Sequence, residues 1–196
     1  MFFLAKPQQQ TIDKFLADRV SDDFSYSEIG ATKSNAPSGY VVDHNRIKLG
    51  SGSSDYEHAK GAIRQWKMFD FDWVELFFDD TPIEVGQTVG ILVSHFGFYS
   101  LSAARIVYTI SESAEIERFG FAYGTLREHA EIGEERFSVE FHHDSGEVWY
   151  DLYAFSKAGS LLTRVGYPLS RYLQRSFARN SKKAMLEFVA NGSSNL

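Results

Sequence analysis

The sequence predicts an α+β fold, in which a curved antiparallel sheet of seven strands wraps around a long C-terminal helix and a short helical extension precedes the sheet. Two observations carry this prediction. Six consecutive strand-length runs with a period of two extend from about residue 71 to residue 156. After Pro168 the apolar period changes to 3.6. A curved sheet must bury its concave face, and the long amphipathic helix is the element available to cover it.

The N-terminal part predicts one helix and an irregular connection. Pro7 stands where a helix can start, and an amphipathic helix over residues 8–19 is expected. Its apolar positions recur at helical spacing: Ile12, Phe15 and Leu16. Residues 21–39 are rich in Ser, Asp, Gly, Asn and Pro, which favours a loop with one short edge strand around residues 24–26. We expect residues 1–38 to form an extension packed on the main domain.

A strand and a helix follow this extension. Tyr40–Leu49 is the first clear strand, and Gly50-Ser-Gly52 ends it. Ser54-Asp-Tyr-Glu57 has the form of a capping box, so a helix is expected over residues 54–67. The residues that share one face of this helix are Tyr56, Ala59, Ile63 and Trp66.

The six later strands are expected from their alternation and from turn residues between them. They are Trp73–Phe78, Thr88–Phe96, Ala103–Ser111, Arg118–Leu126, Glu134–His143 and Val148–Ser156. Pro82 and Gly86 interrupt the first pair, and Asp144-Ser-Gly146 predicts a tight hairpin between the last two.

The last element is a helix over residues 168–189. Its apolar face is formed by Leu169, Leu173, Phe177, Ala184 and Phe188. Residues 39–190 are therefore expected to form one domain, followed by a flexible tail at 191–196. A closed antiparallel β-barrel with helices is the alternative architecture.

Composition excludes several function classes. The chain has 196 residues, 15% of them aromatic, and a net charge of −6. The acidic balance disfavours nucleic-acid binding, and the absence of cysteine excludes disulfides and thiolate chemistry. No window offers the ~20 apolar residues that span a bilayer, and the N-terminus lacks a secretory pattern, so a cytoplasmic location without membrane insertion is expected. No Walker loop or GxGxxG motif is present, and no cofactor is expected.

Several motifs together carry a family resemblance. They are Tyr26-Ser-Glu-Ile-Gly-Ala-Thr32, Pro37-Ser-Gly-Tyr40, Leu49-Gly-Ser-Gly52, Arg105-Ile-Val-Tyr108, Phe119–Leu126 and Gly133-Glu-Glu-Arg-Phe137. In them the chain resembles the "domain of unknown function nineteen-ninety" proteins of bacteria and plants, over nearly its whole length. Ala130 and Lys157-Ala158 depart from the family pattern, where prolines or a Ser-Arg-Pro-like turn are expected. The resemblance implies a single domain and no particular activity.

The element order also resembles the helix-grip fold of the START and Bet v 1-like superfamily. In that fold a cavity lies between the sheet and the C-terminal helix, so the resemblance implies a cavity here. This chain has one clear helix after its first strand, where the helix-grip fold usually has two short ones.

Alternation along the strands selects candidate site residues. His95, Glu135 and Asp151 each share a strand face with apolar residues, and they would point into the cup if those faces line it. A buried carboxylate needs a partner or a shifted pKa, and Arg105 is a plausible partner. They are then polar anchors or an acid–base pair in a ligand cavity. The alternative is that strand edges, bulges or the outer face place them in water.

The block after residue 119 is the second candidate site. A strand ending at Thr125 and a loop with His129, Glu131 and Glu134 could bind a cation. A single loop rarely provides three converging ligands, so we expect no metal. We expect His129 and Glu134 or Glu135 to hold the loop by hydrogen bonds instead.

Two main hypotheses about function remain open. The first is a module that binds a small, largely apolar ligand, with polar contacts from Arg105, Tyr123 and Glu135 and from Gln174 on the covering helix. The second is an enzyme of the cyclase, hydrolase or isomerase kind, using inward His95, Glu135, Asp151 or Tyr123 for proton transfer. A protein-interaction domain with a filled core is a third hypothesis.

Overall fold

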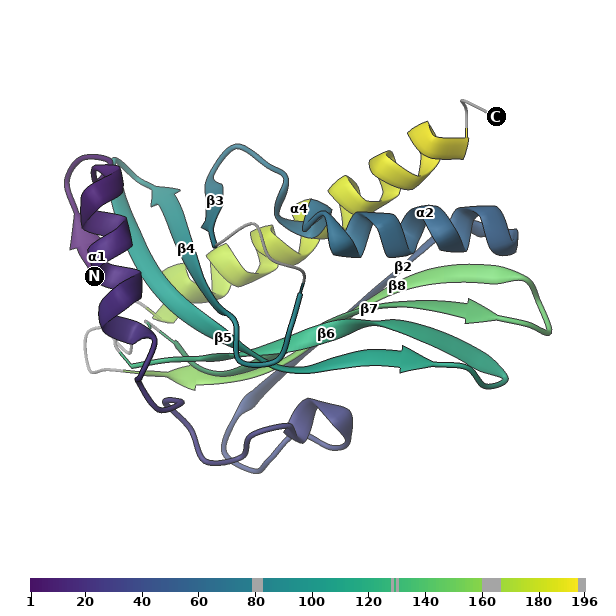
Figure 1. The fold of residues 1–196 in the computed structure, drawn as a ribbon, viewed down its shortest axis with the longest axis horizontal. Helices are drawn as coiled ribbons and strands as arrows, with labels where there is room; N and C mark the ends of the chain where they lie inside the picture. Colours follow the sequence, from purple (N-terminus) through teal and green to yellow (C-terminus); the bar gives the residue numbers. More distant parts are fainter. Residues whose placement is uncertain (79–82, 128, 130, 160–166, 194–196) are drawn as a thin grey trace.

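One open sheet forms the body of the protein (Figure 1). The computed structural model describes residues 1–78, 83–127, 129, 131–159 and 167–193. The strands are β1 (Phe2–Phe3), β2 (Val41–Ser51), β3 (Val74–Phe77), β4 (Thr88–His95), β5 (Phe98–Glu112), β6 (Ile116–Thr125), β7 (Glu131–His142) and β8 (Glu147–Ala158). The helices are α1 (Gln9–Arg19), α2 (Gly52–Arg64) and α4 (Tyr167–Ser193), with 3₁₀ turns η1 (Ala31–Lys33) and η2 (Lys67–Phe69).

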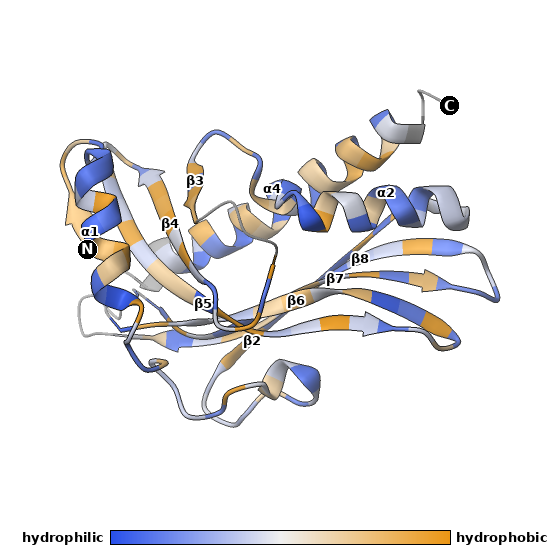
Figure 2. Cartoon of the chain, viewed as in Figure 1, coloured by the Kyte–Doolittle hydropathy of each residue, from blue (hydrophilic) through white to orange (hydrophobic). Residues whose placement is uncertain are grey.

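The strand order confirms the predicted architecture. The sheet runs β2-β8-β7-β6-β5-β4-β3, every neighbouring pair is antiparallel, and the short β1 adds to β5. Within the described part of the chain the end strands β2 and β3 do not pair with each other, so the sheet is open and the barrel alternative is wrong. Orange and blue bands alternate along the long strands in Figure 2, as expected for strands whose two faces differ in environment.

Helices α2 and α4 cover one face of the sheet, and the main core lies beneath them (Figure 1). Phe121, Phe137 and Tyr150 point into this core and are fully buried, and Met185 of α4 packs against them. Helix α4 is 27 residues long. Its second half lies over this filled core, whereas its first half lies over a cavity described below.

The other face of the sheet is also covered, by the N-terminal extension. Ile12 and Phe15 of α1 pack with Leu92, Leu101 and Ala103 on the outer side of β4 and β5. The segment that follows α1 crosses the outer side of β6–β8, where its aromatic rings contact Phe155. Both faces of the sheet are therefore apolar in part.

Several local predictions need correction. Residues 24–26 form a single bridge between Phe24 and Leu126 rather than a strand, and β1 was not predicted. Helix α2 begins at Gly52, and Asp55 rather than Glu57 accepts the Ser51 backbone N–H, at 2.8 Å.

One further difference concerns a predicted turn. The strand β8 continues through Lys157 and Ala158, where the family pattern suggested a turn. Pro82 and Ala130, on which two of the sequence predictions depend, lie outside the described residues. Among the helices that the structure describes, none is long and apolar enough to cross a membrane.

Candidate functional site

A cavity of about 1120 Å³ lies between the concave face of the sheet and the first half of α4. Its apolar wall comes from four different elements, so long-range packing rather than one motif builds it. The apolar residues include Phe69, Trp73, Ile91, Val93, Leu152 and Phe177. Among the described residues, the filled core, on which the protein-interaction hypothesis depends, lies under the second half of α4.

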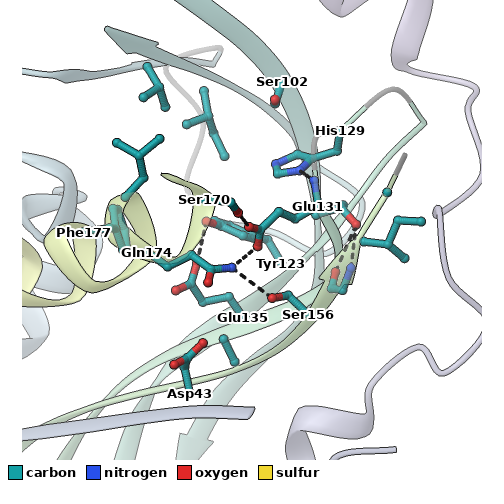
Figure 3. A pocket seen from close by; sticks show the side chains of 18 of the residues that line it. Asp43, Ser102, Tyr123, His129, Glu131, Glu135, Ser156, Ser170, Gln174 and Phe177 are labelled. Carbon is teal, nitrogen blue, oxygen red and sulfur yellow. Dashed lines mark hydrogen bonds between the residues drawn. The ribbon is translucent and has the colours of Figure 1, made fainter. Parts of the chain in front are cut away.

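Polar side chains converge on one part of this cavity (Figure 3). The Tyr123 hydroxyl of β6 donates to Glu135 Oε2 of β7, at 2.8 Å. Gln174 of α4 donates through Nε2 to Ser156 Oγ of β8, at 3.0 Å, and also to Glu131 Oε2. The structure thus brings together Tyr123, Glu135 and Gln174, three of the four polar contacts that the sequence proposes.

Two further residues extend this polar cluster. Ser170 at the start of α4 donates to Glu131 Oε1. Asp43 of β2 forms a bidentate ion pair with Arg171 of α4, at 2.6 and 2.7 Å. Sequence reasoning did not place Asp43, Ser156, Ser170 or Arg171 in this polar cluster. The Asp43–Arg171 pair joins residues 128 positions apart, and only the folded topology reveals it.

The cavity shifts the proton affinity of Glu135. Burial raises the pKa of Glu135 from 4.5 to about 7, the Tyr123 hydrogen bond opposes this, and the negative charges of Glu131 and Asp43 add to it. Burial likewise raises the pKa of Tyr123 well above its ordinary value, and Glu135 adds to this rise. Tyr123 is therefore a hydrogen-bond donor at neutral pH, and Glu135 exchanges its proton near pH 7.

Because the pKa of Glu135 is raised, Glu135→Gln is expected to increase the free energy of unfolding, and this increase should depend on pH. Because the folded protein favours the neutral carboxyl, ionisation of Glu135 opposes folding, so the wild-type free energy of unfolding should fall as pH rises from about 4.5 to above 7. Gln imitates the neutral form. Urea unfolding should show the variant about 3 kcal/mol more stable than wild type at pH 8 and nearly equal to it at pH 4.5. A constant difference across this range would contradict the assignment.

The two candidate histidines lie at the cavity wall. His129 Nδ1 accepts the Glu131 backbone N–H at 3.1 Å, which is the loop-holding hydrogen bond expected of it. Burial lowers the pKa of His129 to about 4, so it is neutral at pH 7. His95 faces the cavity as predicted, its Nε2 lies 3.1 Å from Ser100 Oγ, and burial lowers its pKa.

Asp151 lies on the outer face, contrary to the expectation that it faces the cup. It is 3% exposed and is compensated there by three basic groups. Its carboxylate oxygens lie 2.6 Å from His44 Nε2, 2.9 Å from an Arg136 guanidinium nitrogen and 3.1 Å from Arg46 Nε. This network neutralises Asp151 outside the cavity.

Arg105 also points away from the cup, so it does not partner the cavity carboxylates. Its guanidinium donates to the backbone carbonyls of Arg19, Val20 and Asp22, at 2.7–2.9 Å. These carbonyls lie at and just beyond the C-terminal end of α1, where a cation is favourable. Arg105 thus fixes the N-terminal helix to the outer face.

Glu134 and Thr125 have structural partners. Glu134 is 2% exposed on the outer face. It accepts the backbone N–H groups of Gly30 and Thr32 at 2.7 and 2.9 Å, and the Tyr26 hydroxyl at 2.6 Å. Backbone hydrogen bonds to Glu134 were expected, but the segment that Glu134 holds is 26–32 rather than its own loop. Thr125 Oγ1 lies 2.6 Å from Ser25 Oγ and accepts the Gly133 N–H at 3.0 Å.

Within the described ranges, no group of three His, Asp or Glu side chains is placed to hold a metal ion. The carboxylates of Glu131 and Glu134 lie on different sides of the sheet's hydrogen-bonding network, the first toward α4 and the second toward the N-terminal segment. The cation hypothesis for this loop therefore loses its geometric basis.

An open antiparallel sheet curved around a long C-terminal helix, with a cavity between them, defines a helix-grip protein. Residues 25–184 match the family model described as "Domain of unknown function (DUF1990)". The chain is 39% identical to a UPF0548 protein of Dictyostelium discoideum, with 97% of each covered. It is 35% identical to a UPF0548 protein of Arabidopsis thaliana, with 94% of each covered. The chain therefore belongs to the DUF1990 family, together with these UPF0548 proteins.

Among solved structures, the chain is similar to Ara h 8.0201, at 9% identity and a TM-score of 0.48, covering 78% of this chain and 99% of that chain. It is also similar to human STARD10, at 10% identity and a TM-score of 0.46, covering 97% of this chain and 84% of that chain.

Proposed function

We propose that this protein binds a small, largely apolar ligand in the cavity between the sheet and α4. The observation that carries the proposal is the combination of an apolar wall with a few polar groups that converge from separate elements. Ligand sites in proteins have volumes of roughly 300–1,000 Å³ and this kind of lining. The cavity, at about 1120 Å³, is large enough for a ligand of that class.

The polar groups support a specific orientation of the ligand. Tyr123, Glu135 and Gln174 come from β6, β7 and α4, so the polar part of a ligand would contact both the sheet and the covering helix. The apolar part would contact Phe69, Trp73 and other wall residues.

A cytoplasmic location and the absence of nucleic-acid binding stay predictions. The net charge of −6 supports the second of them.

A fluorescence titration tests the proposal. N-Phenyl-1-naphthylamine is an uncharged apolar dye whose emission rises in apolar surroundings. We expect saturable binding of one dye molecule per chain, because the cavity offers one continuous apolar wall. Absence of saturable binding to the folded protein would contradict the proposal.

A second candidate function is proton transfer on a carbonyl ligand. The observation that favours it is the pKa of Glu135, which lies near 7, where a carboxylate serves both as base and as acid. Tyr123 donates its hydroxyl to Glu135 in this structure, so it would have to turn that hydroxyl away from Glu135 to donate to a carbonyl oxygen.

Deuterium exchange provides a test of this second function. With 2-tetralone in D₂O, a Glu135 base would accelerate exchange of the hydrogens next to the carbonyl, and the rate would rise with pH through about 7 as Glu135 ionises. Glu135→Gln should then lose about 10²–10⁴-fold in rate. The exposed Glu115→Gln serves as the control. Equal rates with wild type, Glu135→Gln and buffer alone would reject proton transfer while leaving ligand binding intact.

A further inference from the structure

Within the part of the chain that the structure describes, two carboxylates in the cavity have only neutral partners. Glu131 accepts hydrogen bonds from Ser170 and Gln174, and Glu135 accepts one from Tyr123. None of the salt bridges within the described part of the chain includes either glutamate. By contrast Asp43, nearby on β2, is paired with a guanidinium. The polar part of the cavity therefore has an excess of negative charge.

The remaining groups around Glu135 do not offset this charge. Burial keeps the pKa of His129 near 4, so that ring is neutral at pH 7. The titratable or charged groups around Glu135 on the elements packed against it are Asp43 of β2, Tyr123 of β6, Glu131 of β7, Tyr150 of β8 and Arg171 of α4. Arg171 is held in a bidentate pair by Asp43 and also donates to Gln174. Two further cations, Arg127 and Arg175, line the cavity, but both are exposed, and Arg127 lies 3.6 Å from Asp23.

The aromatic wall is a second, independent feature that favours a cation. Phe69, Trp73 and Phe177 line the same cavity, and the Phe69 and Phe177 ring centroids lie 5.2 Å apart. The face of an aromatic ring attracts an ammonium group, most strongly where water is excluded. Figure 3 shows Phe177 on the same helix as Gln174, with the carboxyl groups of Glu131 and Glu135 on the facing strands.

We propose that the ligand of this cavity carries a protonated amine on an apolar body, with its nitrogen held by Glu131 and Glu135. This inference rests on the proposed binding function and narrows it to one chemical class. The ammonium donates hydrogen bonds to the two carboxylates, for which the described residues form no ion pair, while the apolar body contacts the aromatic wall.

Three probes with one apolar body test the inference: 4-phenylbutylamine, 4-phenylbutan-1-ol and 4-phenylbutanoic acid. Each is titrated in competition with the naphthylamine dye. At pH 8 we expect the amine to bind at least tenfold more tightly than the alcohol, and the acid to bind most weakly. Because the amine stays charged while Glu135 ionises, its affinity should rise about tenfold from pH 6 to pH 8, and that of the alcohol should not.

Matched variants test whether Glu131 and Glu135 cause the preference for the amine. Glu131→Gln with Glu135→Gln should remove the difference in affinity between the amine and the alcohol. Glu115→Gln, at an exposed position, should change neither. Retained binding of the alcohol and the dye shows that the double variant is folded with its cavity intact.

The other outcomes contradict the proposal that the ligand carries a protonated amine. Equal affinities for the three probes, or tightest binding of the acid, would overturn the inference and leave apolar binding standing. Tightest binding of the alcohol, weakening as pH rises, would mean that protonated Glu135 donates to a neutral acceptor, and would also overturn it. Failure of the dye itself to bind would overturn the proposed function together with this inference.

Discussion

Glu134→Ala is expected to lower the free energy of unfolding by about 3–5 kcal/mol. The carboxylate is 2% exposed and accepts hydrogen bonds from the Tyr26 hydroxyl, the Thr32 hydroxyl and the backbone N–H groups of Gly30 and Thr32. Removing it leaves these donors buried without an acceptor, and each such group costs about 1–3 kcal/mol, not fully additively. Urea denaturation monitored by tryptophan fluorescence measures the change.

The control for this experiment is Glu112→Ala. Glu112 is exposed and lies 3.4 Å from Arg118, so its removal should change the free energy of unfolding by less than about 1 kcal/mol. If the two alanine variants unfolded at the same urea concentration, Glu134 would not hold the N-terminal segment in place.

A pair of bulky substitutions in the cavity has the largest expected effect on binding. Ser102 of β5 and Ala154 of β8 both line the cavity, from strands on either side of β6 and β7. Ser102→Trp combined with Ala154→Phe places two rings where a ligand would lie. The affinity for N-phenyl-1-naphthylamine should fall at least tenfold, because the rings remove the space that the dye occupies.

Its control places similar rings outside the cavity. Ser94 and Thr109 are exposed, and Ser94→Trp with Thr109→Phe should bind the dye as wild type does. If the cavity pair bound the dye as tightly as the exposed pair, the dye would sit elsewhere on the surface. Thermal unfolding of both variants shows that each is folded.

The strand and helix order was predictable because each element has its own apolar period. The change of apolar period from two to 3.6 before α4 is visible within a short stretch of sequence. The same is true of the hairpin turn at Asp144–Gly146 and of the helical period around Ile12 and Phe15. The short β1 was not predictable, because two residues carry no period and the strand forms only by adding to β5.

Which face of each strand is inside was harder to predict. Asp151 does share a face with Trp149, Tyr153 and Phe155, but that face is the outer one. Phe155 is fully buried there, because Tyr26 and Tyr40 of the N-terminal segment pack on it, with ring centroids 5.7 and 5.0 Å away. When both faces of a sheet are covered, alternation groups residues correctly but cannot assign the group to the inside.

In the candidate site, too, local patterns were predictable and long-range contacts were not. Tyr123, Glu135 and His95 were placed correctly because their strands have one clearly apolar face, and Gln174 because α4 was expected to cover the sheet. Arg105 was misplaced because the C-terminal end of α1, whose carbonyls it contacts, lies 83–86 residues away in sequence. Contacts of that range depend on the completed fold and leave no local pattern in the sequence.

Native mass spectrometry of the gently purified protein tests ligand binding in the cavity, because it weighs the chain together with whatever the cavity holds. We expect wild-type chains that carry one small molecule, which is released on denaturation and is missing from the Ser102→Trp, Ala154→Phe variant. The mass of the bare chain alone in both proteins, with no uptake of added dye by the wild type, would contradict this expectation.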